Sequence, residues 1–105
     1  MHFDGPAKMR SFWRGAIKKM HYTYVLLLSN KKFYIGSTSN LKLRLKDHKN
    51  GRVKSTRQFL PLELVYFECC FSKTDAIKRE YQLKTGFGRG YLRRRLENFL
   101  NNTPT

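Results

Sequence analysis

Acidic residues are scarce in this chain of 105 residues, which has 7 Asp and Glu against 22 Lys and Arg. The resulting formal net charge of +15 disfavours the compact state through self-repulsion unless an anion is close by. Nucleic acid is the commonest partner of a small domain with this balance, because each phosphate contact releases counterions. The charge therefore predicts an anionic partner, with nucleic acid favoured over a membrane surface.

The sequence also has no long apolar run and no pair of cysteines separated along the chain. No apolar run reaches the roughly 20 residues of a membrane span, and no signal peptide is recognisable. The two cysteines, Cys69 and Cys70, are adjacent in a strand-like segment, where neighbours point to opposite faces and make poor joint metal ligands or disulfide partners. We therefore expect a cytoplasmic protein without a membrane partner, whose cysteines are small buried hydrophobes.

The length allows one domain with one modest core. Hydrophobic residues make up 40% of the chain and aromatics 14%, which excludes a disordered basic tail. We expect residues 1–20 to form an extension, either loosely ordered or a short helix that docks through Trp13, and Met20 is an alternative natural start. The domain proper is expected over residues 21–100, followed by a tail over residues 101–105.

Three segments read as strands. Tyr22–Leu28 is rich in strand-forming residues and apolar throughout, so we expect both of its faces to be covered. The SNKK loop then leads to a short strand over Phe33–Gly36, and Leu62–Phe71 forms the third.

Three segments read as helices. Leucine spacing predicts the first over Asn40–Asn50, and Ser72 is a suitable N-cap for the second over Lys73–Lys84. The glycine-rich sequence TGFGRG is expected to break that helix before a last one over Tyr91–Leu100. The predicted class is α/β (α+β), in the order β-β-α-β-α-α.

Helical spacing brings charged groups to apolar faces. In the stretch FYIGSTSNLKLRLKDH, Arg44 and His48 share a stripe with leucines and are expected at the edge of the buried face. A guanidinium there is costly unless it meets an anion, so Arg44 either pairs with an acid or serves an anion site. Glu80 lies beside the apolar face of its helix, where it either neutralises Arg44 or holds one hard divalent cation such as Mg²⁺.

Tyrosines follow the first two strands. Tyr24 and Tyr34 are either core residues or a source of phenolic oxygens that orient or deprotonate water when a nearby cation lowers their pKa. Gly36 lies on the same strand face as Tyr34 and lacks a side chain. It is expected to let another backbone or a phosphate come close.

These motifs resemble the GIY-YIG nuclease superfamily over residues 22–100. The resemblance rests on YTY, YIG, NLKLRL and REYQLK, and on YIG followed by the S-T-x-N-L-x-x-R-L-x-x-H pattern. VKSTR, LVYFE and LKTGFGRGYLRRRL resemble the small stand-alone bacterial members, which are often labelled excinuclease-like. The first motif differs, since Tyr22 and Thr23 replace its glycine and isoleucine and only Tyr24 is kept.

The resemblance implies a three-stranded antiparallel sheet flanked by helices, and metal-dependent hydrolysis of phosphodiesters. By position, Tyr24 and Tyr34 would flank the attacking water, and Arg44 would stabilise the pentacovalent phosphate. His48 would position or activate the nucleophile, and Glu80 would hold a single Mg²⁺ or Mn²⁺.

The remaining basic segments suggest contacts to backbone phosphates, which position nucleic acid without reading its sequence. We therefore expect little base specificity and a steep salt dependence. DNA is expected ahead of RNA as the substrate, although these contacts do not distinguish the two. A partner protein or a homodimer could supply specificity. The expected phosphate contacts, besides Gly36, are Lys54, Ser55, Thr56, Arg57, Lys84, Arg89 and Arg93.

Two other functions fit the same composition. The first is a non-catalytic nucleic-acid-binding module with a GIY-YIG-like fold, which the altered first motif favours. The second is a structural basic protein, such as a ribosome-associated one, which gives no reason for Glu80 to face inward.

Overall fold

The computed structural model describes residues 19–102. The expected N-terminal helix with Trp13 and the end of the expected tail lie outside the described residues. Within residues 19–102, no helix is both long enough and apolar enough to cross a membrane.

The core of the fold is a three-stranded antiparallel sheet with the order β2-β1-β3. Strand β1 (His21–Leu27) lies in the middle and pairs with β2 (Phe33–Thr38) and β3 (Glu63–Cys70). Four successive residues of β1 are buried, which confirms the prediction that both of its faces are covered. The predicted fold class and element order are likewise confirmed.

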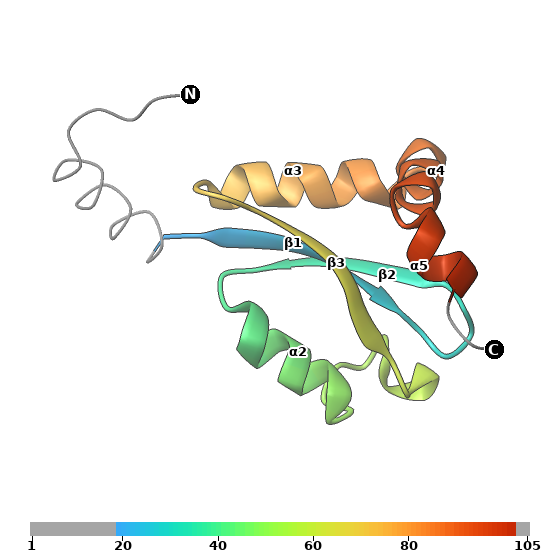
Figure 1. Ribbon diagram of the computed structural model, residues 1–105. Helices are drawn as coiled ribbons and strands as arrows, with labels where there is room; N and C mark the ends of the chain where they lie inside the picture. The colour runs from blue at the N-terminus through green and yellow to red at the C-terminus, as the bar shows by residue number, and fades with distance from the viewer. Residues whose placement is uncertain (1–18, 103–105) are drawn as a thin grey trace, which may run out of the picture.

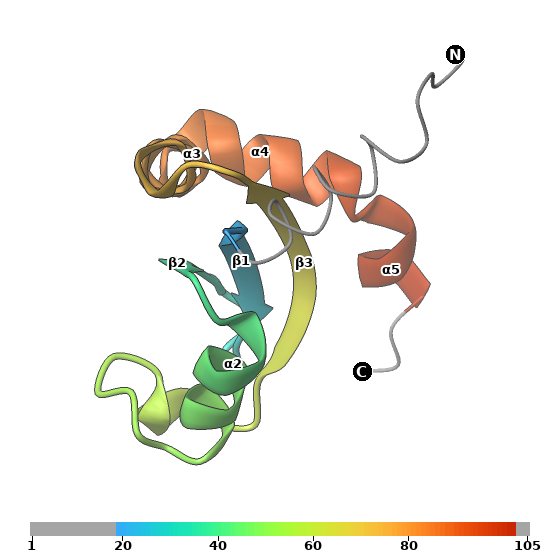
Figure 2. The same cartoon turned by 90° about the vertical axis from the view of Figure 1, so that its left-hand side faces the viewer.

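Helices cover both faces of the sheet (Figures 1 and 2). Helix α2 (Leu41–Lys49) lies on one face, and α3 (Lys73–Lys84) and α4 (Gly86–Arg95) lie on the other. Alternate residues of β1 therefore enter two separate cores. One core contains Tyr24, Leu26, Leu28 and Leu62, and the other contains Val25, Ile35, Leu83 and Leu92.

Two side-chain contacts tie α3 to the sheet. The Thr23 hydroxyl donates to the carbonyl of Ala76 at 2.8 Å. Arg79 forms a two-pronged ion pair with Glu68 of β3, with both N–O distances at 2.9 Å. A bidentate guanidinium–carboxylate pair fixes orientation as well as distance, so these contacts set the position of the helix that carries Glu80.

Helices α2 and α3 both begin at a side-chain cap. The Asn40 side chain accepts a hydrogen bond from the Leu43 N–H at 3.1 Å at the start of α2. Ser72 does the same for the Asp75 N–H at 3.2 Å at the start of α3. Each cap satisfies a backbone donor that the helix itself leaves unpaired; the predicted cap of α3 is confirmed, and α2 starts one residue later than predicted because Asn40 is its cap.

The predicted break after α3 is present but is confined to Thr85, and the last helix starts earlier than predicted and is divided in two. Helix α4 starts at Gly86, directly after Thr85, and a further helix, α5 (Glu97–Asn102), follows Leu96. A Cβ on Gly88 would lie 2.3 Å from the Gln82 carbonyl oxygen. The glycine thus allows α4 to pack closely against the end of α3, and close packing outweighs its low helix propensity.

The basic loop after α2 contains a short 3-10 helix, η1 (Arg57–Phe59). The prediction for the two cysteines was wrong. Cys69 is exposed and Cys70 only partly buried, although both were expected in the core. Strand β3 is an edge strand, and Cys69 lines an open groove between it and α2.

We expect Gly88→Ala to lower the free energy of unfolding by about 1–3 kcal/mol, because a Cβ there meets backbone atoms that cannot move independently. Urea unfolding followed by circular dichroism measures the change. Gly86→Ala is the matched control, since a Cβ at that position would meet no neighbouring atom within 4 Å; equal losses in both variants would contradict the packing explanation.

Candidate active site

Tyr24 lies over Gly36 of the neighbouring strand. The two residues are directly paired across β1 and β2, and a Cβ on Gly36 would lie 2.5 Å from the Tyr24 hydroxyl oxygen. We expected this glycine to admit a foreign backbone or a phosphate, but the Tyr24 ring fills the space. Gly36 therefore allows a buried tyrosine to extend across β2.

Helix α2 brings two side chains to the Tyr24 hydroxyl. His48 Nε2 lies 2.9 Å from it, and Arg44 Nε donates to it at 3.4 Å. Tyr34 completes the cluster, because its ring centre lies 5.2 Å from that of His48 and 6.4 Å from that of Tyr24. The four residues predicted to be catalytic are therefore contiguous in space.

His48 is fully buried, whereas we expected it at the edge of the buried face. Its second ring nitrogen, Nδ1, lies 2.8 Å from the hydroxyl oxygen of Thr56. Thr56 is itself fully buried, so the prediction that its side chain contacts a phosphate was wrong. Sequence reasoning missed this contact because it joins a loop to a helix and follows no periodicity.

Burial sets the protonation states in the cluster. It lowers the pKa of His48 to about 4, and the positive charge of Arg44 lowers the pKa in the same direction. Burial also raises the pKa of Tyr24, although the hydrogen bond from Arg44 opposes this. At neutral pH the Tyr24 phenol is therefore protonated and the His48 imidazole is neutral. In the tautomer with the proton on Nδ1, His48 donates a hydrogen bond to the Thr56 hydroxyl and accepts one from the Tyr24 hydroxyl.

Glu80 forms an ion pair with Lys84, one helical turn along α3, at 2.6 Å. Arg44 bonds to Tyr24 instead, so the pairing of Arg44 with Glu80 that we considered is not what the structure shows. The Glu80 charge nevertheless contributes to raising the pKa of Tyr24.

The carboxylate of Glu80 is the candidate metal ligand. Among residues 19–102, no three His, Cys, Asp or Glu side chains are grouped closely enough to hold a metal ion. This excludes an all-protein cage in that part of the chain, but it fits Mg²⁺, which is often held by one or two carboxylates with water and phosphate oxygens. The Glu80 side chain is 18% exposed and already attracts one cation, the Lys84 ammonium.

An open groove of about 540 Å³ adjoins the cluster. Tyr34 and Arg44 line it together with Lys54 and Ser55, and the Ser55 hydroxyl donates to the Tyr34 hydroxyl at 3.5 Å. Two of the predicted phosphate contacts, Lys54 and Ser55, thus lie beside the predicted catalytic residues. Val53, Gln58 and Phe59 complete the lining.

The other predicted phosphate contacts lie elsewhere. Arg57 and Arg89 are exposed on η1 and α4. The guanidinium of Arg93 lies 5.6 Å from the ring centre of Phe33, the first residue of β2. None of the three lines the groove, so any contact they make with nucleic acid lies beyond it.

This fold and cluster define a GIY-YIG domain. The sequence model of the GIY-YIG catalytic domain matches residues 20–101, and the chain belongs to this family. Among its members the chain is similar to the UPF0213 proteins.

Three UPF0213 relatives illustrate this similarity. The protein from Bacillus pumilus is 42% identical over 69 residues, which cover 65% of this chain and 70% of the relative. The protein from Clostridium perfringens is 44% identical over 66 residues, covering 62% of this chain and 71% of the relative. The solution structure of a UPF0213 protein from Bacillus halodurans is 32% identical, covers 70% of this chain and 81% of that chain, and has a TM-score of 0.46.

The buried neutral His48 predicts a loss of stability in acid. Its folded-state pKa of about 4 lies below the ordinary value of 6.5, so between these values the unfolded chain binds the extra proton. Its contribution to stability is fully present above about pH 6.5 and declines toward pH 4, by at most about 3 kcal/mol. Chemical unfolding at several pH values measures this, and a His48→Gln variant should lack this part of the decline.

Thr56→Val keeps the shape of the side chain and removes the partner of His48 Nδ1. We expect a loss of about 1–3 kcal/mol of stability, the cost of an unsatisfied buried polar group, and loss of a fixed imidazole orientation. Thr56→Ser should restore both. ¹H–¹⁵N correlation of the His48 ring nitrogens distinguishes the tautomers, and a Val variant with an unchanged ring spectrum would contradict the positioning role.

Proposed function

We propose that this protein is a metal-dependent endonuclease that hydrolyses phosphodiester bonds, with DNA as its substrate. The observation that carries this proposal is the hydrogen-bonded cluster of Tyr24, Arg44 and His48 beside an open basic groove. Such an arrangement addresses both difficulties of the reaction: charge repulsion at the phosphate and deprotonation of water.

Arg44 binds and orients the scissile phosphate. The Arg44 Nε–H donates a hydrogen bond to the Tyr24 hydroxyl. The two terminal nitrogens have no hydrogen-bond partner among residues 19–102, and Arg44 lines the groove. They offer two donors to non-bridging phosphate oxygens. Preorganised donors placed where negative charge grows usually provide the largest part of catalysis.

Tyr24 and His48 accept and transfer the proton of the attacking water. Tyr34 lines the groove whereas Tyr24 is buried behind it, so the attacking water would bind beside Tyr34 and pass its proton to Tyr24 Oη while the Tyr24 proton passes to His48 Nε2. The hydroxide attacks phosphorus and the bond to the leaving oxygen breaks. The low pKa of His48 means that the imidazole does not retain this proton. The proton returns through Tyr24 to the product side, which restores the starting state.

Glu80 would hold a single Mg²⁺ or Mn²⁺. When bound, the cation supplies Lewis-acid stabilisation of the charge on the phosphate. The chain itself contributes Lys84, whose ammonium contacts one Glu80 oxygen, Oε2, and competes by its charge with a cation for the carboxylate; once displaced, Lys84 is free to contact the substrate. Metal binding and release of Lys84 are therefore coupled.

The substrate is held mainly through its phosphates. Lys54 and Ser55 line the groove, and Arg57, Arg89 and Arg93 extend the basic surface. Such contacts carry no sequence information, so little base specificity is expected, and specificity comes from a partner protein or a second copy of the chain. We place this activity in the cytoplasm.

One observation favours a second candidate, a non-catalytic nucleic-acid-binding module. The Glu80 carboxylate is paired with Lys84, and a permanent ion pair would neutralise the charge that attracts a metal. The two functions differ in one measurable property, turnover in the presence of a divalent cation.

Glu80→Gln should reduce cleavage by at least about 10²-fold, the usual scale for loss of one charge-stabilising group, while nucleic-acid binding is retained. Cleavage of branched, single-stranded and duplex DNA with Mg²⁺ or Mn²⁺ provides the assay. Arg44→Lys should also lose most activity, because a lysine keeps the charge but not the planar fork.

Glu63→Gln is the matched control, since it removes the same charge from an exposed position on β3. Undiminished cleavage in Glu80→Gln would refute the metal role. Tight, salt-sensitive binding by the wild type without any cleavage would establish the non-catalytic module instead.

A further inference from the structure

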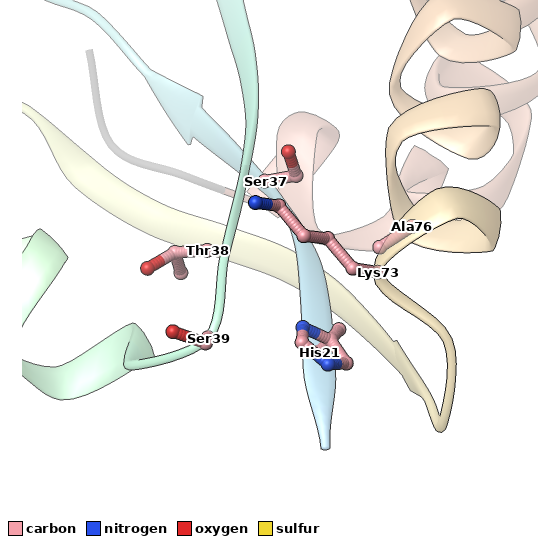
Figure 3. Close-up of a pocket in the computed structure, with 6 residues that line it drawn as sticks. All are labelled: His21, Ser37, Thr38, Ser39, Lys73 and Ala76. Carbon is pink, nitrogen blue, oxygen red and sulfur yellow. The ribbon is translucent and has the colours of Figure 1, made fainter. Parts of the chain in front are cut away.

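A second polar pocket lies at the other end of the β2 edge (Figure 3). It has a volume of about 250 Å³ and is formed where β1 begins, β2 ends and α3 begins. None of the residues already placed at the candidate active site lines it. The lining residues are His21, Ser37, Thr38, Ser39, Lys73 and Ala76.

The polar groups of this pocket are suited to an anion. Lys73 extends from the start of α3 toward β2 beside Ser37 (Figure 3), and within residues 19–102 its ammonium has no ion-pair or hydrogen-bond partner. The hydroxyls of Ser37 and Ser39 are likewise unbonded in that part of the chain. Thr38 differs, because its hydroxyl is engaged with the backbone of Asn40.

No carboxylate is among the described residues that line the pocket. One ammonium and two free hydroxyls provide charge and directional donors without a competing internal anion. This is the usual set of side chains that contact nucleic-acid phosphates.

The pocket and Glu80 lie along one line on α3. Lys73, Glu80 and Lys84 are separated by seven and four residues, so they share one stripe of the helix. Seven residues of α-helix rise by about 10 Å, and a few nucleotides of one strand span such a distance. Neighbouring strand residues point to opposite faces, so Ser37 faces α3 whereas Gly36 and Tyr24 face α2, and a strand that contacts both sites must pass the β2 edge.

We propose that this pocket binds a second, uncleaved phosphate of the substrate strand, a few nucleotides from the phosphate held at Arg44. The statement that a cut is made at the neighbouring phosphate rests on the proposed function. The binding of a phosphate in this pocket does not depend on it. Lys73 forms the ion pair, and Ser37 and Ser39 donate hydrogen bonds. The strand therefore follows the β2 edge, and the pocket sets its register relative to Tyr24.

Binding without divalent metal tests the pocket independently of cleavage. A fluorescent single-stranded oligonucleotide is titrated at several salt concentrations with the wild type, Lys73→Ala and Lys78→Ala. Lys78 is the matched control, because it is an exposed lysine of the same helix that lines a different pocket, beside β3. We expect the slope of log K against log salt to shrink by about 0.7 for Lys73→Ala and to be unchanged for Lys78→Ala.

A neutral methylphosphonate linkage, moved one position at a time along the oligonucleotide, locates the contact. At one position the neutral linkage should weaken binding by the wild type as much as Lys73→Ala does. At the same position the linkage should not weaken binding by Lys73→Ala any further. If no position shows this coupling, or if the two lysine variants have equal slopes, the pocket proposal is overturned.

Two further outcomes separate the possible errors. Inorganic phosphate should shift the amide resonances of Ser37 and Ser39, and the oligonucleotide should displace it; failure of displacement would indicate a free-anion site and overturn the strand assignment. If Lys73→Ala shows the expected loss but Mg²⁺ produces no cleavage by the wild type, the proposed endonuclease function fails and the phosphate pocket stands.

Discussion

The hydrogen bonds of the Tyr24 hydroxyl are the interaction on which the rest of the site depends. Tyr24 reaches His48 and Arg44 only because Gly36 leaves room for its ring. His48 in turn is fixed by Thr56 from the following loop. The central strand, the edge strand and α2 therefore meet at one phenolic oxygen, and the loop is connected to it through His48. Displacement of any of these elements would misplace the guanidinium of Arg44, which lines the groove.

The scarcity of acids explains how this chain distributes its charge. Among residues 19–102 three carboxylates form ion pairs: Asp47 with Arg52, Glu68 with Arg79 and Glu80 with Lys84. The Glu68 pair fixes α3 against β3, and the Glu80 carboxylate contributes to raising the pKa of Tyr24. Most other basic side chains have no acidic neighbour among the described residues, so their charge is available to phosphate. A nucleic-acid strand bound along β2 would reduce the self-repulsion that a net charge of +15 imposes.

Elements with local signals were predictable from the sequence. Ser72 and Asn40 are caps whose side chains act within three residues, and the apolar run of β1 predicted a central strand. The start of the helix after α3 was wrongly predicted because Gly88 is selected by contact with Gln82 of the preceding helix. The position of the cysteines was wrong for a related reason, since exposure depends on where β3 lies in the sheet.

The sequence by itself determined which residue types are present for phosphate chemistry, and helical spacing placed Arg44 and His48 one turn apart. Only the tertiary structure decided their partners. Arg44 bonds to a tyrosine rather than to Glu80, Thr56 turns inward to His48, and Gly36 accommodates a ring of the protein itself. These contacts join segments far apart in the chain, so they depend on how two helices cover opposite faces of one narrow sheet, and no periodicity in the sequence records that arrangement.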